Sequence, residues 1–201
     1  NVLGYQTHRD SFAVSKDKEV LLKRLEDFTN PEMNVGELVR KYNLNIKGWN
    51  IDQARKEIRG QELEQFISAT TYRPFDNQFV ILHKLISDRP RTEILQSIVN
   101  RDNISLLCSR QQATTGFHHA FVTKLPPNDC VISTKSREAN QVFPLYIYPE
   151  SGERNVNLNK EITDQIGKTI GNVLPEDIFD YAYSVLHSPK YREKYKEFLK
   201  I

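Results

Sequence analysis

The chain has 201 residues, 38% of them hydrophobic and 10% aromatic, and its formal net charge at pH 7 is +2. This composition is ordinary for a globular protein, and no apolar run approaches the roughly 20 residues that a membrane-spanning helix needs. The sequence therefore excludes a membrane protein, and a charge this small does not by itself indicate a polyanionic partner.

Apolar residues at helical spacing predict that the first part of the chain, residues 1–69, is helical. The expected helices cover about residues 16–28, 34–42 and 51–67. Asn30-Pro31 ends the first helix, because the residue before a proline disfavours the helical conformation. Asn50 can cap the third helix through its side chain, and Gly60 is a candidate break within it.

The next part, residues 70–149, is rich in β-branched and aromatic residues and predicts a small mixed β-sheet. A strand pair over residues 70–85 is expected to turn at Asp76-Asn77, and the rings of the segment Tyr72–Asp76 are expected to lie in the core. A helix over about residues 91–99 has Pro90 as its first-turn residue. Further strands are expected over residues 103–108, 117–123, 130–133 and 142–148, and the polar loops are 109–116, 124–129 and 134–141.

The last part, residues 150–201, is expected to return to helix over residues 158–170, 175–187 and 189–199. Pro175 suits a first helical turn, and the two acids after it are favoured there by the helix dipole. We therefore predict a single α+β domain over residues 1–201, in which a small mixed β-sheet in the middle of the chain is flanked by N- and C-terminal helices.

No constellation of residues in the sequence predicts a catalytic or metal site. Cys108 and Cys130 lie in apolar surroundings without zinc-site spacing, which indicates reduced cysteines of a cytoplasmic protein. The glycines form no phosphate-binding loop. His118 and His119 are neighbours on an expected strand and point to opposite faces, so we expect one packed and one exposed histidine. A hydrolase using either one would need a pocket that joins it to a carboxylate or a nucleophile.

Positive charge concentrates in the middle, where residues 71–138 hold nine Lys or Arg against six Asp or Glu. Arg110, Gln111 and Gln112 follow an apolar strand, and such side chains can pair with guanine and adenine edges, although a solvated loop has the same composition. The segment 134–137 suits phosphates. Arg89 and Arg91 could contact a nucleic-acid backbone or pair internally with Asp88 or Glu93.

Several short motifs occur along the chain in an order that is specific as a set. They are Thr7-His8-Arg9-Asp10-Ser11-Phe12, Tyr72-Arg73-Pro74-Phe75-Asp76, Asp88-Arg89-Pro90-Arg91, Leu107-Cys108-Ser109-Arg110-Gln111, Phe117-His118-His119-Ala120-Phe121-Val122, Val142-Phe143-Pro144-Leu145-Tyr146-Ile147-Tyr148 and Leu186-His187-Ser188-Pro189-Lys190-Tyr191-Arg192. In this order they resemble the C-terminal target-recognition (specificity) region of Type ISP restriction-modification enzymes and related Type IIG-like DNA adenine methyltransferases, over nearly the whole chain.

The resemblance implies a single-polypeptide enzyme in which a methyltransferase domain, often with a nuclease or translocase, precedes a domain like this one. Such enzymes transfer methyl from S-adenosylmethionine to an adenine that is flipped out of the duplex. The family's Asn-Pro-Pro-Tyr-type catalytic motif and a methyl-donor glycine motif are absent from this sequence. The chain also begins at Asn1 without a methionine, so we expect a fragment that is not an enzyme by itself and holds no cofactor of its own.

The resemblance also implies that the middle loops face double-stranded DNA. The candidate DNA-binding residues are then Arg110, Gln111 and Gln112 for bases, Lys124, Lys135 and Arg137 for phosphates, and Arg89 and Arg91 for either backbone contact or internal pairing. Residues 7–12 are expected at the junction with the upstream methyltransferase domain. The alternative function is a structural or protein-interaction domain that couples the other parts of the same enzyme, which near-neutral helical ends would suit.

Overall fold

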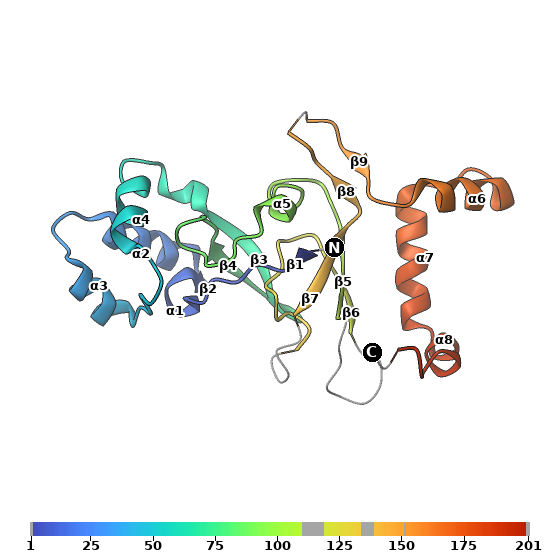
Figure 1. The fold of residues 1–201 in the computed structure, drawn as a ribbon, viewed down its shortest axis with the longest axis horizontal. Coiled ribbons are helices and arrows are strands. Elements are labelled where there is room, and N and C mark those ends of the chain that lie inside the picture. The colour runs from blue at the N-terminus through green and yellow to red at the C-terminus, as the bar shows by residue number, and fades with distance from the viewer. Residues whose placement is uncertain (1, 110–118, 134–138, 151, 200–201) are drawn as a thin grey trace.

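The computed structural model describes residues 2–109, 119–133, 139–150 and 152–199, and its arrangement confirms the predicted α+β class. Figure 1 shows an elongated molecule with a helical unit at one end, β-sheets in the middle and a second helical unit at the other end. No helix in these described ranges is long and apolar enough to cross a membrane. Most of the strands lie between the N-terminal and the C-terminal helices in the sequence, but the short strands β1 (Val2–Leu3) and β2 (Val14–Ser15) lie within the first part.

The N-terminal helical unit contains the predicted helices close to their expected bounds. Its elements are α1 (Asp10–Ala13), α2 (Lys18–Thr29), α3 (Val35–Tyr42), α4 (Ile51–Ile58) and the short 3-10 helix η1 (Leu63–Phe66). Side chains cap three of them. Asp17 accepts from the backbone of Glu19 on α2, Asn34 and Glu37 form a capping box on α3, and Asn50 accepts from the backbone of Gln53 on α4. Gly60, with φ of +81°, breaks the third predicted helix after Ile58.

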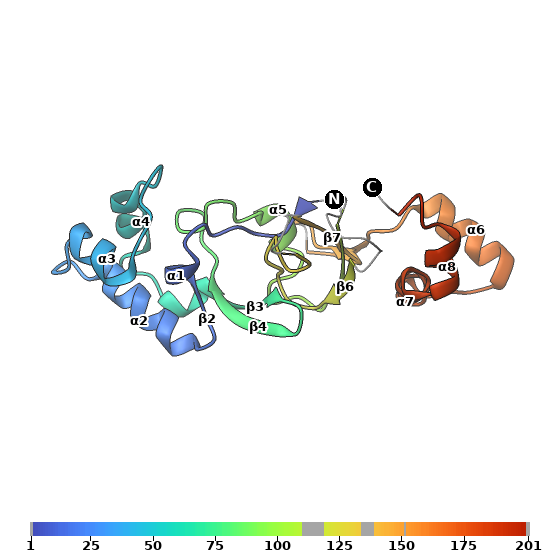
Figure 2. The same cartoon turned by 90° about the horizontal axis from the view of Figure 1, so that it is seen from below.

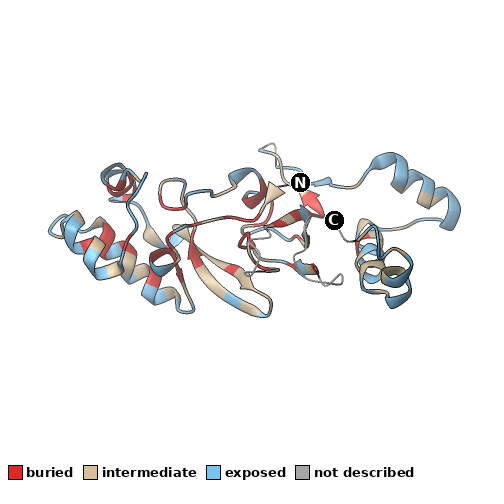
Figure 3. Ribbon diagram, turned by 60° about the horizontal axis from the view of Figure 1, so that its bottom comes forward, coloured by how far each residue is buried: buried red, intermediate tan, exposed pale blue. Residues whose placement is uncertain are grey.

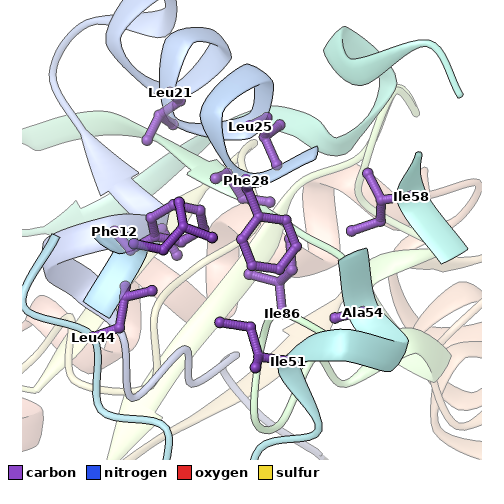
Figure 4. Packing of buried hydrophobic residues seen from close by; sticks show 12 residues of the cluster. Phe12, Leu21, Leu25, Phe28, Leu44, Ile51, Ala54, Ile58 and Ile86 are labelled. Carbon is purple, nitrogen blue, oxygen red and sulfur yellow. The ribbon is translucent and has the colours of Figure 1, made fainter. Parts of the chain in front are cut away.

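Apolar side chains from these helices and the adjoining strands meet in one core, shown in Figure 4. Phe12, Leu21 and Phe28 are fully buried in it, and the rings of Phe28 and Trp49 stack with their centroids 5.6 Å apart. Arg55 crosses the edge of this core and donates hydrogen bonds to the carbonyls of three residues. The helical unit therefore has a hydrophobic core of its own, distinct from that of the central sheet.

A three-stranded antiparallel sheet joins this unit to the centre of the molecule. Its strands lie in the order β2 (Val14–Ser15), β4 (Asp76–Ile81) and β3 (Ile67–Arg73). The strand pair was predicted, but its turn was placed wrongly: the chain reverses at Pro74-Phe75, and Arg73 pairs with Asp76. Proline at the first position of a two-residue turn fixes φ there, which explains the shift.

The central sheet has four antiparallel strands. They lie in the order β1 (Val2–Leu3), β7 (Asn140–Pro144), β5 (Ser105–Ser109) and β6 (Ala120–Thr123). Because β6 and β7 lie on opposite sides of β5 and are both antiparallel to it, the connection between them must return along the length of the sheet. We call this connection, residues 124–139, the crossover.

Two predicted elements of the middle part differ in the structure. Residues 130–133 are not a strand, because side chains replace the expected ladder: Asn128 Oδ1 accepts from the backbone of Cys130, and Asn140 Oδ1 accepts from that of Val131. The helix predicted over 91–99 is shortened to α5 (Thr92–Leu95), since Arg91 has φ of +55° and Pro90 therefore lies outside the helix.

The C-terminal unit consists of the three predicted helices, with the last one shorter than expected. After Pro144 the chain forms the two-stranded ribbon β8 (Tyr146–Ile147) and β9 (Asn155–Val156), followed by α6 (Lys160–Ile170), α7 (Pro175–His187) and α8 (Pro189–Lys194). The Tyr146 hydroxyl donates to Glu176 on α7, and His187 Nε2 lies 3.1 Å from the carbonyl oxygen of Ala120. Figure 3 shows that α6 to α8 are mostly exposed, in contrast to the central strands.

Candidate nucleic-acid interface

One end of the central sheet collects the ends of three strands. Ser109 pairs with Asn140, and Cys108 pairs with Ala120, so the predicted loops 109–116 and 134–141 start or finish at this end. The base-reading candidates Arg110, Gln111 and Gln112 and the phosphate candidates Lys135 and Arg137 lie outside the described residues. His119, beside the first loop, is buried as predicted for one histidine of the pair, and His118 lies outside the described residues.

Lys124 lies at the other end of β6. It directly follows Thr123, which pairs with Ser105 at the opposite end of β5 from Ser109. The Lys124 side chain is exposed and free to reach a phosphate, as its predicted role requires. The structure thus brings Ser109 and Asn140 together but places Lys124 about one strand length away from them.

Arg89 and Arg91 differ in their exposure and in their contacts. Arg89 pairs through its backbone with Gln6, and its exposed guanidinium lies 3.7 Å from the carboxylate of Asp88. Arg91 is half-buried, its Nε makes no hydrogen bond within the described part of the chain, and none of the ion pairs found there includes it. Both alternatives stay predictions, with Arg89 the better exposed of the two.

The β3–β4 hairpin reaches the central sheet at its tip, and Figures 1 and 2 both show it next to β6. Thr71 Oγ1 and Thr123 Oγ1 share a hydrogen bond of 2.6 Å, and Arg73 donates to Asn128 Oδ1 of the crossover over 2.9 Å. The Tyr72 hydroxyl donates to Asp10 Oδ2 over 2.7 Å. The residues just before the turn, which we call the base of the turn, are therefore held by β6, by α1 and by the crossover.

Phe75, at the tip of this hairpin, is the residue that sequence reasoning placed wrongly. The prediction put its ring in the core, whereas its side chain is fully exposed and only Tyr72 is partly covered. The signal that could have found it is the position of Phe75 after Pro74 between two strands, because the outer residues of a two-residue hairpin turn have no sheet neighbour to cover them.

A polar pocket opens between the N-terminal segment and the crossover. Among its lining residues are Gln6, Asp10, Arg73, Asp129 and Cys130. Burial raises the pKa of the Cys130 thiol to about 11, with Asp129 adding to the effect, and burial alone raises the pKa of the Cys108 thiol to about 11. Both cysteines are free, as predicted, and both thiols stay protonated near neutral pH.

Of the two histidines that the alternative hydrolase would use, the structure describes only His119, because His118 lies outside the described residues. His119 is buried beside β6 and does not line the polar pocket. Across the described ranges, no three His, Cys, Asp or Glu side chains are grouped so that they could hold a metal ion. What the site offers is a rigid sheet whose strand ends and hairpin tip present polar segments, cations and one exposed ring.

A scaffold that fixes strand ends leaves the connecting segments to make functional contacts, in binding domains and in enzymes alike. The family model of the Type ISP C-terminal specificity domain matches residues 1–201, so the chain belongs to that family. This confirms the family that the ordered motifs indicated. No curated protein matches the chain significantly.

Three solved structures are similar in fold. The chain superposes on a DrdV–DNA complex with a TM-score of 0.77 at 24% identity, covering 98% of this chain and 20% of that one. A nuclease-deletion mutant of the Type ISP restriction-modification enzyme LlaGI, in complex with a DNA substrate mimic, gives 0.66 at 20% identity, covering 98% and 19%. The ATP-dependent Type ISP enzyme LlaBIII bound to DNA gives 0.67 at 19% identity, covering 98% and 13%. The chain thus spans a fifth or less of each of these proteins, and the likeness is one of fold.

Proposed function

We propose that this chain is the sequence-recognition part of a bacterial restriction-modification enzyme and that it binds double-stranded DNA. The observation that carries the proposal is the match of the specificity-domain family over every residue of the chain. The fold it shares with parts of three proteins whose structures were solved with DNA or a DNA mimic supports the same function. The domain itself carries out no chemistry.

The division of work between scaffold and loops follows from the physics of reading DNA. Phosphate contacts position a protein on the duplex, and base contacts specify the sequence. Arg110, Gln111 and Gln112 would read bases from a segment that starts at Ser109, where the ladder to Asn140 fixes the backbone. The cations Lys124, Lys135, Arg137 and Arg89 would hold the phosphates, and Arg91 is the weakest member of this set because it is half-buried.

The parent enzyme we propose is an adenine-specific DNA methyltransferase of the cytoplasm that uses S-adenosylmethionine. The eight glycines of this chain form no methyl-donor motif, so we assign the cofactor to an upstream methyltransferase domain. The part played by this chain is to read the bases around the target adenine and to hold the duplex against that domain.

The first experiment tests sequence recognition directly. The intact protein that carries this chain selects duplexes from a pool with a randomised central segment, and the selection should enrich one sequence. Arg110→Ala should then lose about 1–3 kcal/mol of discrimination at one base position, the worth of a bidentate base contact. Transplanting residues 1–201 onto a related methyltransferase should change the sequence that is methylated, and an unchanged sequence specificity would contradict the proposed function.

The second experiment separates phosphate contacts from base contacts. Lys135→Ala should weaken binding to all sequences alike and reduce the slope of log affinity against log salt by about 1. Lys47→Ala is the matched control, because Lys47 is an exposed lysine of the N-terminal helical unit, outside the central sheet. Equal salt slopes for Lys135→Ala, Lys47→Ala and the wild type would remove Lys135 from the interface.

One observation favours a second function for part of the chain, namely coupling to another part of the same enzyme. The C-terminal unit exposes large apolar side chains, among them Ile162, Ile170 and Leu174, and apolar surface of this kind is typical of contacts between proteins or domains. Replacing one of these apolar side chains by a charged one, as in Ile170→Lys, should leave the affinity for DNA unchanged and reduce methylation by the intact enzyme. A loss of DNA affinity instead would assign this surface to DNA.

A further inference from the structure

Phe75 is exposed to a degree that is unusual for a large apolar residue. It forms the outermost point of the β3–β4 turn, and no other large apolar side chain in the described residues is fully exposed. In the sequence the polar or charged residues Arg73, Asp76 and Asn77 lie close to it, and in space its ring contacts that of Phe121 on β6.

The backbone at Phe75 is also unfavourable for the residue that it carries. Its φ is +60°, a left-handed conformation that suits glycine and is an outlier for a bulky side chain. At the second position of a turn that begins with proline, glycine is the residue expected. The backbone conformation therefore does not explain a phenylalanine at this position, and the ring stays fully exposed although its edge contacts that of Phe121.

The base of the turn is held rigidly, so the ring has a fixed place. The Arg73 guanidinium lies over the Tyr72 ring, 3.9 Å from its centroid, and also donates to Asn128 of the crossover. Asp76, on the other side of the turn, accepts from Gln78 Nε2 over 2.8 Å. Because these contacts order the backbone that carries the ring, a partner that covers the ring has to order the Phe75 side chain but not the turn.

The Phe75 ring lies beside strand β6 of the central sheet. The centroid of the Phe75 ring lies 6.5 Å from that of Phe121 on β6, with an angle of 76° between the planes. Lys124 is exposed just beyond the end of the same strand. A projecting ring with a cation on the adjoining strand is the combination that binds nucleic acid through stacking and phosphate contact.

We propose that Phe75 is a wedge that inserts between two base pairs of the bound duplex and unstacks them. This inference rests on the proposed function of the chain as a DNA-recognition domain. Apolar side chains inserted at a base step kink the duplex and are compensated by the contacts that the bend allows. A single ring on a two-residue turn fits the narrow space between bases, whereas a protein partner would need a broader apolar surface.

The experiment measures unstacking by the intact protein that carries this chain. Duplexes of the sequence enriched in the selection carry 2-aminopurine at one position after another, and the wild type should brighten this base at one step. Phe75→Gly should abolish the brightening and weaken binding roughly tenfold to a hundredfold, as expected for the loss of a base–aromatic stack. Phe75→Trp should retain the brightening. Phe198→Ala, at an exposed phenylalanine of the C-terminal unit, is the matched control and should behave as the wild type.

Thermal unfolding separates this role from a structural one. Because glycine adopts a positive φ freely, Phe75→Gly should unfold at the same temperature as the wild type or at a higher one. Wild-type brightening and affinity in Phe75→Gly would overturn the wedge and leave DNA recognition standing, even if that variant lost contact with another protein. Failure of the wild type to enrich any sequence would instead overturn the proposed function, and the wedge with it.

Discussion

His83 shows how one partly buried side chain makes stability depend on pH. Its ring packs edge-on against Phe66 with the centroids 5.0 Å apart, and its Nδ1 accepts a hydrogen bond from the backbone N–H of Leu85. Burial lowers the pKa of His83 below its ordinary value of 6.5; the Glu57 carboxylate opposes this effect, and Lys84 adds to it. The folded state therefore binds its proton less readily than the unfolded state does.

The free energy of unfolding therefore falls as the pH is lowered. The contribution of His83 to stability is complete above pH 6.5 and is lost as the pH falls from there through the lower pKa of the folded state. Urea unfolding should show that the free energy of unfolding of the wild type falls more between pH 7.5 and pH 5 than that of His83→Gln, which has no ring to protonate. Equal falls in the two proteins would contradict a lowered pKa at His83.

Residue types predicted the chemistry of this chain better than they predicted where its side chains point. The free cysteines follow from their apolar neighbours, and strand alternation predicted one buried histidine in the pair His118 and His119, which His119 is. Both signals are local. Phe75 could not be placed in this way, because an aromatic residue is ordinarily buried and its exposure depends on a turn fixed by Pro74. The site therefore departs from sequence rules at the residue where we expect contact with DNA.

At the level of elements, Gly4 controls how closely β1 approaches the crossover. A Cβ atom at this position would lie 2.5 Å from the carbonyl oxygen of Asn128, and backbone atoms cannot move aside as a flexible side chain would. Gly4→Ala should therefore destabilise the protein by about 1–3 kcal/mol in urea unfolding, a typical cost of overpacking. It should also weaken DNA binding, since Asn128 holds Arg73 at the base of the turn.

The control for Gly4 lies in α6. A Cβ at Gly167 meets nothing within 4 Å, so Gly167→Ala should leave stability unchanged or raise it by up to about 1 kcal/mol, because alanine favours helix. If Gly4→Ala were as stable as Gly167→Ala, the crossover would have to be free to move away from β1. That result would contradict the inference that the crossover holds the base of the turn in place.

Elements defined by local signals were predicted well, and those defined by distant partners were not. The caps at Asn34 and Asn50 act within one helical turn, which is why α3 and α4 begin where the sequence indicates. Residues 130–133 have the composition of a strand, but their backbone partners are the side chains of Asn128 and Asn140, which no local pattern reveals. The predicted strand failed because the sheet was completed by β1 from the other end of the chain.

At the level of the whole molecule, burial is distributed unevenly between the two helical units. The N-terminal unit has a core in which Leu21, Leu25 and Phe28 of α2 are fully buried. No described side chain of α6 is buried, and α7 buries only Phe179. Few apolar contacts therefore hold α6 in place, and local opening should be easiest there.

Hydrogen exchange followed by mass spectrometry measures this gradient and also separates the two proposed functions. In the chain alone, the amides of α6 should exchange much faster than those of α2, because opening α6 exposes little apolar surface. Adding the selected duplex should slow exchange in β6, which ends just before Lys124, and in the β3–β4 turn, which contains Phe75, and should leave α6 unchanged. In the intact enzyme α6 should become protected without DNA, because coupling to another domain would cover Ile162 and Ile170. Slow exchange of α6 in the chain alone would show that this helix needs no partner and would contradict the coupling function. Protection of α6 by DNA alone would instead extend the DNA-recognition surface into the C-terminal unit.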